Sequence, residues 1–251
     1  MSQAAQNQRP SVSVQIQGLR KSFGEVEVLH GIDLKIAPRE VFVIMGPSGS
    51  GKSVLLKHLI GLETPDAGDV LIDGHSIQSP GMLERYRLAM VFQSGALLNS
   101  LTVAENVGLY LTEHQLLPQD EIDQIVKQKL EALGLKGQED RMPEELSGGM
   151  KKRVAIARAL VIDPQIILYD EPTSELDPLI AVTIGQEIKR LNQENDVTSI
   201  VVSHDRDLAF GIADRIALLE DGQVLQVGTP KELAESKNEK VQKFLNASFQ
   251  F

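Results

Sequence analysis

The residues with the clearest chemical potential form one short, glycine-rich run. It follows the pattern G-x-x-x-x-G-K-[S/T] and consists of Gly46, Pro47, Ser48, Gly49, Ser50, Gly51, Lys52 and Ser53. Glycines let the backbone bend so that successive N–H groups face one anion. In such loops the lysine contacts the β- and γ-phosphates, and the hydroxyl ligates Mg²⁺. The run therefore predicts a site for a nucleoside triphosphate with Mg²⁺.

The segments on either side of this loop supply the strand and helix that such a site requires. Residues 41–45 form an apolar run, which predicts a buried strand, and residues 54–60 predict a short helix that Gly61 ends. The positive end of the helix dipole would face the phosphates. A glycine-serine turn that binds nothing would not need both flanks, so the binding interpretation is favoured.

Two carboxylates end a second apolar run. Residues 166–169 predict a buried strand, and Asp170 and Glu171 follow directly. Ligands gather at the carboxyl ends of strands in open parallel sheets. Asp170 suits a magnesium ligand, and Glu171 suits the base or orienting group for water that attacks the γ-phosphate. The plainer alternative is an exposed acidic turn before Pro172, and the apolar run argues against it.

Two further polar residues follow predicted strands. Gln93 comes after residues 88–92 and could place its amide near the metal and the attacking water. His204 comes soon after residues 198–202 and could hydrogen-bond a γ-phosphate. Taken by itself, Gln93 is better interpreted as an ordinary polar loop residue. For His204 the structural and functional interpretations balance.

A second glycine pair opens another predicted helix. Ser147 precedes Gly148 and Gly149, so this segment is a candidate anion-binding helix terminus, with a plain N-cap as the alternative. The basic residues that follow are interpreted as a solvated helix face; they are Lys151, Lys152, Arg153 and Arg158.

Composition narrows the class of protein. The chain has 251 residues, 42% of them hydrophobic, which allows one large domain or two small ones. The absence of cysteine excludes disulfides and thiolate metal sites, and five scattered histidines argue against structural zinc. The net charge of −10 argues against a nucleic-acid partner and against direct docking on anionic lipid. No run is long enough to cross a bilayer, and the N-terminus lacks the apolar region of a secretory signal.

The remaining periodicities place these motifs in an α/β chain. Alternating apolar residues at 12–16 and 32–36 predict a small antiparallel sheet before the loop. From residue 94 the period becomes helical, with a helix expected over 120–134, and residues 216–227 predict a closing hairpin. Phe23 could stack on an adenine, although its position by itself favours an ordinary buried phenylalanine.

Together these segments resemble the ATP-binding-cassette (ABC) ATPases over residues 12–227. The matching motifs are the Walker A loop at 46–53, the Q-loop at Gln93, the signature at 146–150, the Walker B strand ending in Asp170 and Glu171, the D-loop at 174–177 and the switch histidine, His204. Phe23 lies where the family has its adenine-stacking aromatic residue, which reverses the preference for a buried role. Met150 and Glu175 depart from the family pattern, since Gln and a small residue are usual there.

The resemblance implies an α/β fold with a RecA-like parallel-sheet core, an N-terminal antiparallel β subdomain and a helical insertion. The expected divisions are a disordered lead-in (1–11), the β subdomain with the first part of the ATP-binding core (12–93), the helical signature subdomain (94–160), the second part of the core (161–228) and a C-terminal tail (229–251). The apolar tail residues would pack on their own domain or on a partner subunit; they are Val241, Phe244, Leu245, Phe249 and Phe251.

The resemblance also implies ATP hydrolysis with Mg²⁺ by a head-to-tail homodimer, with each ATP between one chain's Walker A loop and the other's signature. The implied nucleotide contacts come from Phe23, residues 46–53, Ser147, Gly148, Gly149 and Asp177. The implied metal ligands are Ser53, Gln93 and Asp170, and the residues implied in hydrolysis are Glu171, His204 and Gln93.

Residues 92–103 and 146–153 are most similar to the ATPases of MCE-type phospholipid transporters, which maintain envelope lipid asymmetry. That similarity implies permease subunits, an MCE-domain lipid-binding protein, a possible small accessory subunit and a place on the cytoplasmic face of the inner membrane, with no nucleic acid. An importer of polar solutes is the alternative, although such ATPases often carry a long C-terminal domain, and this chain ends soon after Val227. A soluble cassette protein acting on DNA or ribosomes would usually have two cassettes or a more basic surface.

Overall fold

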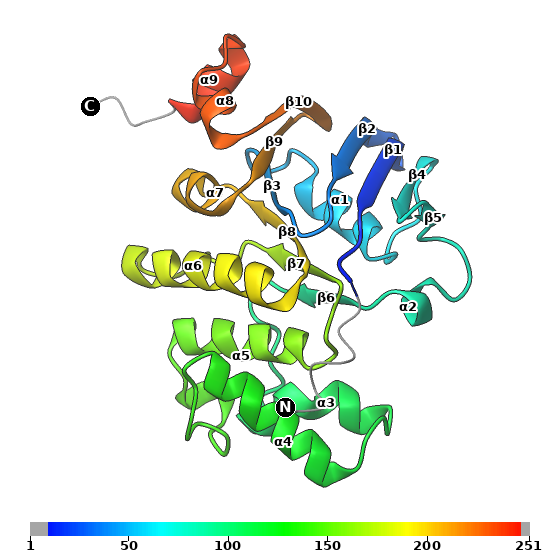
Figure 1. Cartoon of the computed structure of the whole chain (residues 1–251). Coiled ribbons are helices and arrows are strands. Elements are labelled where there is room, and N and C mark those ends of the chain that lie inside the picture. The colour runs from blue at the N-terminus through cyan, green and yellow to red at the C-terminus, as the bar shows by residue number, and fades with distance from the viewer. Residues whose placement is uncertain (1–9, 247–251) are drawn as a thin grey trace.

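Two β-sheets and the helices around them build the chain (Figure 1). The computed structural model describes residues 10–246, so the lead-in predicted for residues 1–11 lies almost wholly outside the described residues. None of the described helices is long and apolar enough to cross a membrane.

The smaller sheet is antiparallel and has the strand order β2-β1-β4-β5. Its strands are β1 (Val14–Phe23), β2 (Val26–Ile36), β4 (Ala67–Ile72) and β5 (His75–Ser76). The sequence predicts this sheet, but β1 and β2 are longer than the alternation indicates. They continue through residues 19–28 as one hairpin, and Gly24 adopts the left-handed φ of 62° at its turn.

The larger sheet has the strand order β10-β9-β3-β8-β7-β6, and all its pairs are parallel except β9 with β10. Its strands are β3 (Val41–Met45), β6 (Leu88–Val91), β7 (Ile166–Asp170), β8 (Thr198–Ser203), β9 (Arg215–Glu220) and β10 (Gln223–Gly228). The central strands β3, β7 and β8 are buried at every position except Asp170, because both faces of the sheet are covered. Met45 pairs with Ser203, and Asp170 pairs with Val202, so the carboxyl ends of β3, β7 and β8 meet at one edge.

The side chains of β3 alternate between two hydrophobic cores. Phe42 and Ile44 join a core with the antiparallel sheet and α1 (Lys52–Leu59). Val41 and Val43 join the other core, with α5 (Gly148–Leu160), α6 (Pro178–Asn195) and α7 (Arg206–Ile212). The helices that follow the two glycine-rich motifs, α1 and α5, therefore belong to opposite faces of the larger sheet.

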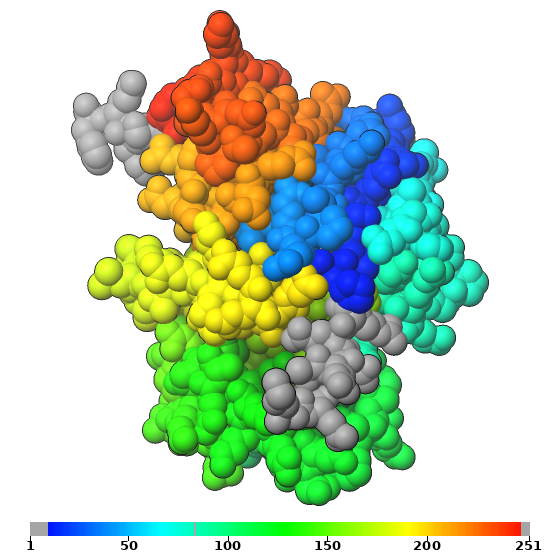
Figure 2. Space-filling model, viewed as in Figure 1, coloured from blue at the N-terminus to red at the C-terminus, as the bar shows by residue number. Residues whose placement is uncertain are grey.

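The helical insertion is a group of its own at one end of the molecule (Figure 1, green), and its atoms form one end of the visible surface in Figure 2. It contains α3 (Val103–Glu113), α4 (Gln119–Ala132) and α5, while the short α2 (Met82–Arg85) precedes it. The helix expected over 120–134 is α4, which begins and ends slightly earlier. A capping box, in which Thr102 and Glu105 satisfy each other's backbone N–H groups, opens α3.

Two short helices follow the closing hairpin β9–β10. These are α8 (Pro230–Ala234) and α9 (Glu239–Leu245), and Val241 and Leu245 are buried in the chain's own core. Part of the predicted tail thus packs on its own domain. Phe249 and Phe251, for which contact with a partner subunit is also considered, lie outside the described residues.

Candidate functional site

The phosphate loop joins β3 to α1, as its flanks predict. Lys52, the first residue of α1, is only 8% exposed, and its Nζ donates hydrogen bonds of 2.8 Å to the carbonyl oxygens of Gly46 and Pro47. Burial lowers the pKa of the Lys52 ammonium, and the carboxylates of Glu171 and Asp170 oppose that shift. The ammonium is therefore held inside the loop and next to acidic partners.

The space around the loop fits a bound phosphate. A Cβ at Gly46 would lie 2.1 Å from the carbonyl oxygen of Leu219, so only glycine fits against that strand. At Gly49 the backbone has a φ of 80°, and a Cβ would meet nothing within 4 Å. The side of the loop at Gly49 is thus open, as an anion-binding concavity requires. Ser53 is exposed at the start of α1, where its hydroxyl is available to a ligand.

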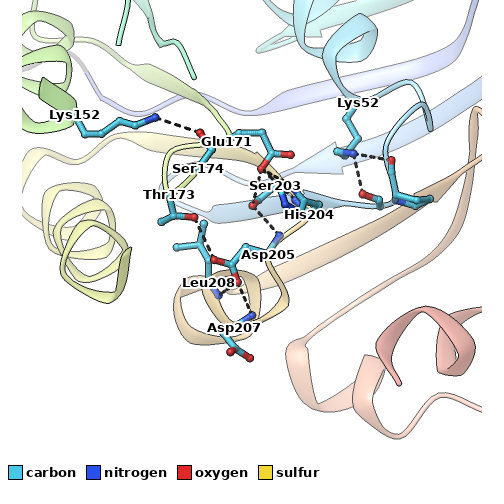
Figure 3. Close-up of polar contacts among 12 residues, drawn as sticks. Lys52, Lys152, Glu171, Thr173, Ser174, Ser203, His204, Asp205, Asp207 and Leu208 are labelled. Atoms are coloured by element: carbon cyan, nitrogen blue, oxygen red, sulfur yellow. Dashed lines mark hydrogen bonds and ion pairs between the residues drawn. The ribbon is translucent and has the colours of Figure 1, made fainter. Parts of the chain in front are cut away.

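Glu171 is the centre of a hydrogen-bonded group at the edge of the parallel sheet (Figure 3). Its Oε2 accepts from the Ser203 hydroxyl at 3.1 Å and from the His204 backbone N–H at 3.3 Å, and it lies 2.9 Å from His204 Nδ1. The Glu171 side chain is 13% exposed, whereas that of His204 is 64% exposed. The structure therefore brings the predicted base and the predicted switch histidine into direct contact.

Asp170 lies beside Glu171 in an environment that suits a cation. Burial and the neighbouring Glu171 carboxylate raise the pKa of Asp170, while the ammonium groups of Lys52 and Lys152 lower it. Two adjacent carboxylates repel one another, and a divalent cation would relieve that repulsion. Asp170 and the Ser53 hydroxyl are oxygen donors of the kind that Mg²⁺ prefers. The residues present therefore fit Mg²⁺.

The side chains of Gln93 and Phe23 are both exposed. Gln93 comes two residues after the end of β6, which pairs with β7, and its side chain is exposed. Phe23 ends β1 and is 48% exposed, with Lys21 Nζ 5.3 Å from the ring centroid. The interpretation of Phe23 as an ordinary buried phenylalanine is therefore wrong, and its ring is free to stack on a planar ligand.

The signature residues are not brought to the phosphate loop within one chain. Ser147 caps α5, accepting a hydrogen bond from the Met150 N–H at 3.3 Å. Gly148 and Gly149 open that helix on the opposite face of the sheet from α1. Asp177 caps α6, accepting from the N–H groups of residues 179 and 180. Contacts of these residues with nucleotide stay predictions.

Gly149 packs so closely against Ile180 that a larger residue should destabilise the fold. A Cβ at Gly149 would lie 2.7 Å from Ile180 Cγ2, so Gly149→Ala must displace the Ile180 side chain or push α5 away from α6. We expect a loss of about 1–3 kcal/mol in the free energy of unfolding, measured by urea titration. Gly211→Ala in α7 is the control, because a Cβ there meets nothing within 4 Å and should stabilise the helix by about 0.4–1 kcal/mol. Equal stability of both variants would contradict the predicted clash.

The prediction of a solvated basic face on α5 is wrong for Lys152 and Arg158. Lys152 is 6% exposed and its Nζ donates to the Gln93 carbonyl oxygen and, at 3.5 Å, to Ser174 Oγ. Arg158 donates hydrogen bonds of 2.7 Å to the carbonyl oxygens of Gly95 and Ala96. Burial lowers the pKa of both cations. These contacts join segments far apart in the sequence.

A second connection that the motifs do not indicate joins the loop after β7 to the loop after β8. The Thr173 hydroxyl donates to Asp205 Oδ2 at 3.2 Å, while Asp205 Oδ1 caps α7 (Figure 3). Together with the Ser203–Glu171 hydrogen bond, this contact fixes the segment that carries His204 against the segment that carries the carboxylates.

Comparison with known proteins agrees with this arrangement. The sequence profile described as "ABC transporter" matches residues 29–174. The chain is 41% identical to the "Probable ribonucleotide transport ATP-binding protein mkl" of Mycobacterium leprae, over 94% of this chain and 69% of that protein. It is 40% identical to the "Intermembrane phospholipid transport system ATP-binding protein MlaF" of Haemophilus influenzae, over 92% of this chain and 89% of that protein.

Solved structures have the same fold. The dimeric, post-hydrolysis structure of the ATP-binding cassette MJ0796 with ADP and Pi has a TM-score of 0.77 and 35% identity, covering 86% of this chain and 98% of that one. The chain's α/β fold is thus that of the ABC ATPases, with the phosphate loop, Asp170, Glu171 and His204 at one edge of the parallel sheet. This chain therefore belongs to the ABC transporter family, as an ATP-binding subunit.

Proposed function

We propose that this chain hydrolyses ATP to drive a phospholipid transporter, working as a homodimer with two composite sites. The observation that carries the hydrolytic part is the contact between Glu171 and His204 beside the phosphate loop. A carboxylate at that position can take a proton from an attacking water molecule. The acceptor geometry favours a fixed carboxylate, because Ser203 and the His204 backbone both donate to the same oxygen.

The remaining residues of this edge take supporting roles. Lys52 and the loop N–H groups bind the phosphates, and the exposed His204 side chain bonds the terminal phosphate and so links its presence to Glu171. Ser53, Asp170 and Gln93 would hold Mg²⁺. The metal supplies charge neutralisation at the phosphate oxygens when bound.

The dimer follows from the position of the signature. Ser147, Gly148 and Gly149 open α5, which packs on the face of the sheet opposite α1, so we infer that one chain holds two half-sites. Head-to-tail pairing would place each signature helix start against the nucleotide on the partner's loop, where backbone N–H groups and the helix dipole favour phosphate. The similarity to a dimeric cassette supports this pairing.

The cargo is proposed from a relative whose match covers most of both chains. MlaF is a phospholipid transport ATPase by name, and the match spans 89% of it. The relative named for ribonucleotide transport is equally similar, and it supports the alternative of a polar-solute transporter. Phe92 and Leu98 are exposed apolar residues close to Gln93 in the sequence, and they suit contact with a short helix of a membrane permease. That partner would hold the chain at the cytoplasmic face of the inner membrane.

Pull-down of the tagged chain from its native membranes in mild detergent tests the cargo. Mass spectrometry should identify a permease, an MCE-domain protein and bound phospholipid, with a small accessory subunit as a further candidate. A permease with a solute-binding protein and no MCE-domain protein would contradict the phospholipid assignment. A tagged Phe92→Ser, Leu98→Ser variant is the matched control, because it should lose the permease while keeping ATP binding.

A further inference from the structure

The loop that carries Gln93 is held by cations from the signature helix. Lys152 lies one turn after the signature residues in α5, and its Nζ donates to the Gln93 carbonyl oxygen. The same ammonium lies 3.5 Å from the hydroxyl of Ser174, in the loop between the Walker B carboxylates and Asp177 (Figure 3). One side chain therefore touches both loops that reach the catalytic edge.

Arg158 holds the next residues of the same loop. Its guanidinium donates to the carbonyl oxygens of Gly95 and Ala96 at 2.7 Å each. Both residues have left-handed backbones, with φ of 74° at Gly95 and 46° at Ala96. That conformation is strained for a non-glycine residue such as Ala96, so surrounding contacts must hold it there. Arg158 supplies such contacts.

The environment of Lys152 is not that of a surface lysine. Its side chain is buried, which lowers the pKa of its ammonium, and the negative charges of Glu175, Asp170 and Glu171 oppose that lowering. A buried charge is stable only when it is paired and hydrogen-bonded. The hydrogen bonds of the Lys152 ammonium are thus what allows this charge to be buried.

We propose that Lys152 is a positioning residue, which fixes the Gln93 loop and the Ser174 loop of its own chain to the signature helix. The inference rests on the proposed dimer, in which the start of α5 meets the nucleotide on the partner. Because α5 is one helix, closure of its start onto that nucleotide moves Lys152, and Lys152 moves the two loops. The state of one composite site thereby sets the geometry of the other.

Two Lys152 variants test this role. Lys152→Met keeps the length and removes the charge and the donors, and we expect kcat for ATP hydrolysis to fall about ten- to hundredfold, the loss of one charge-assisted hydrogen bond. The ATP dissociation constant should stay within twofold, since Lys52 and its loop are untouched. Lys152→Arg should recover most of the lost kcat. Lys151→Met is the matched control, because no hydrogen bond or ion pair of its side chain occurs within residues 10–246.

Hydrogen–deuterium exchange of the same proteins gives a readout that does not need hydrolysis. In Lys152→Met, the amides of residues 92–98 should exchange faster, while those of residues 46–53 keep their rates. Global unfolding of the variant would instead raise the exchange rates of both segments. Equal exchange and equal kcat in Lys152→Met and the unaltered chain would overturn the positioning role. If the unaltered chain hydrolyses no ATP, the proposed function fails, and the exchange of residues 92–98 decides the positioning role by itself.

Discussion

Replacing Glu171 by Gln should abolish steady ATP hydrolysis while ATP binding persists. The amide keeps the shape of the side chain and can still accept the hydrogen bonds from Ser203 and the His204 backbone. It cannot take a proton from water, and losing a general base typically costs a factor of about 10²–10⁴. Phosphate release under saturating ATP and Mg²⁺ measures the rate, and fluorescent-nucleotide titration measures the binding.

The control for this variant is Glu235→Gln, which makes the same change at an exposed position after α8 and should hydrolyse ATP at the unaltered rate. Undiminished turnover of Glu171→Gln would remove Glu171 from its assigned role. Loss of ATP binding together with turnover would instead mean that the carboxylate organises the loop, because the Glu171 charge is part of the surroundings of Lys52.

Replacing Lys52 by Ala should weaken ATP binding and abolish most of the hydrolysis. The buried ammonium is held inside the loop by two backbone carbonyl oxygens, and alanine supplies no cation in its place. A hydrogen bond to a charged group contributes about 1.5–3 kcal/mol, which predicts a roughly ten- to hundredfold rise in the ATP dissociation constant. Calorimetric titration with ATP and Mg²⁺ measures it.

Lys57→Ala is the matched control, since Lys57 is exposed further along the same helix and should leave the affinity for ATP unchanged. Thermal unfolding of both variants separates a lost ligand contact from a collapsed loop. Normal affinity and normal ATPase activity of Lys52→Ala would refute the phosphate-loop assignment.

The sequence predicts the catalytic edge because each of its parts is local. An apolar run followed by glycines or carboxylates identifies a strand and the loop at its end, and the parallel pairing then aligns those ends. This is why Lys52, Asp170, Glu171 and His204 could be assigned to one site before their contacts were known. The Glu171–His204 contact itself spans two strands, and only the register of β7 with β8 produces it.

The sequence does not predict the Lys152 and Arg158 contacts because they join a helix to a distant loop. A basic run after a helix start is typical of a solvated face. A signal was nonetheless present, because Gly149, Lys152 and Ile156 follow helical spacing and Gly149 and Ile156 are buried. From Val154 onward nearly all residues of α5 are apolar, so apolar side chains point to nearly every side of the helix. This pattern indicates a helix that other elements cover on nearly all sides. A lysine in such a helix must have partners.

Phe23 is a residue for which the sequence pattern predicts burial but the structure shows exposure. An aromatic residue beside a turn glycine is usually buried, yet β1 and β2 extend as a ribbon whose end leaves the ring 48% exposed. The apolar alternation stops before the strand pairing does, so it underestimates the length of β1 and β2. Only the resemblance to the ABC ATPases predicts a ligand-stacking role for the Phe23 ring.

The measurement that tests the composite-site dimer most directly is the molar mass of Glu171→Gln in solution, by light scattering with and without ATP and Mg²⁺. We expect the mass to double only when ATP is present, because the bound nucleotide joins one chain's phosphate loop to the other's signature. Adding Ser147→Arg should return the mass to that of one chain while ATP still binds to the Lys52 loop. A single-chain mass of Glu171→Gln at saturating ATP would contradict the composite site.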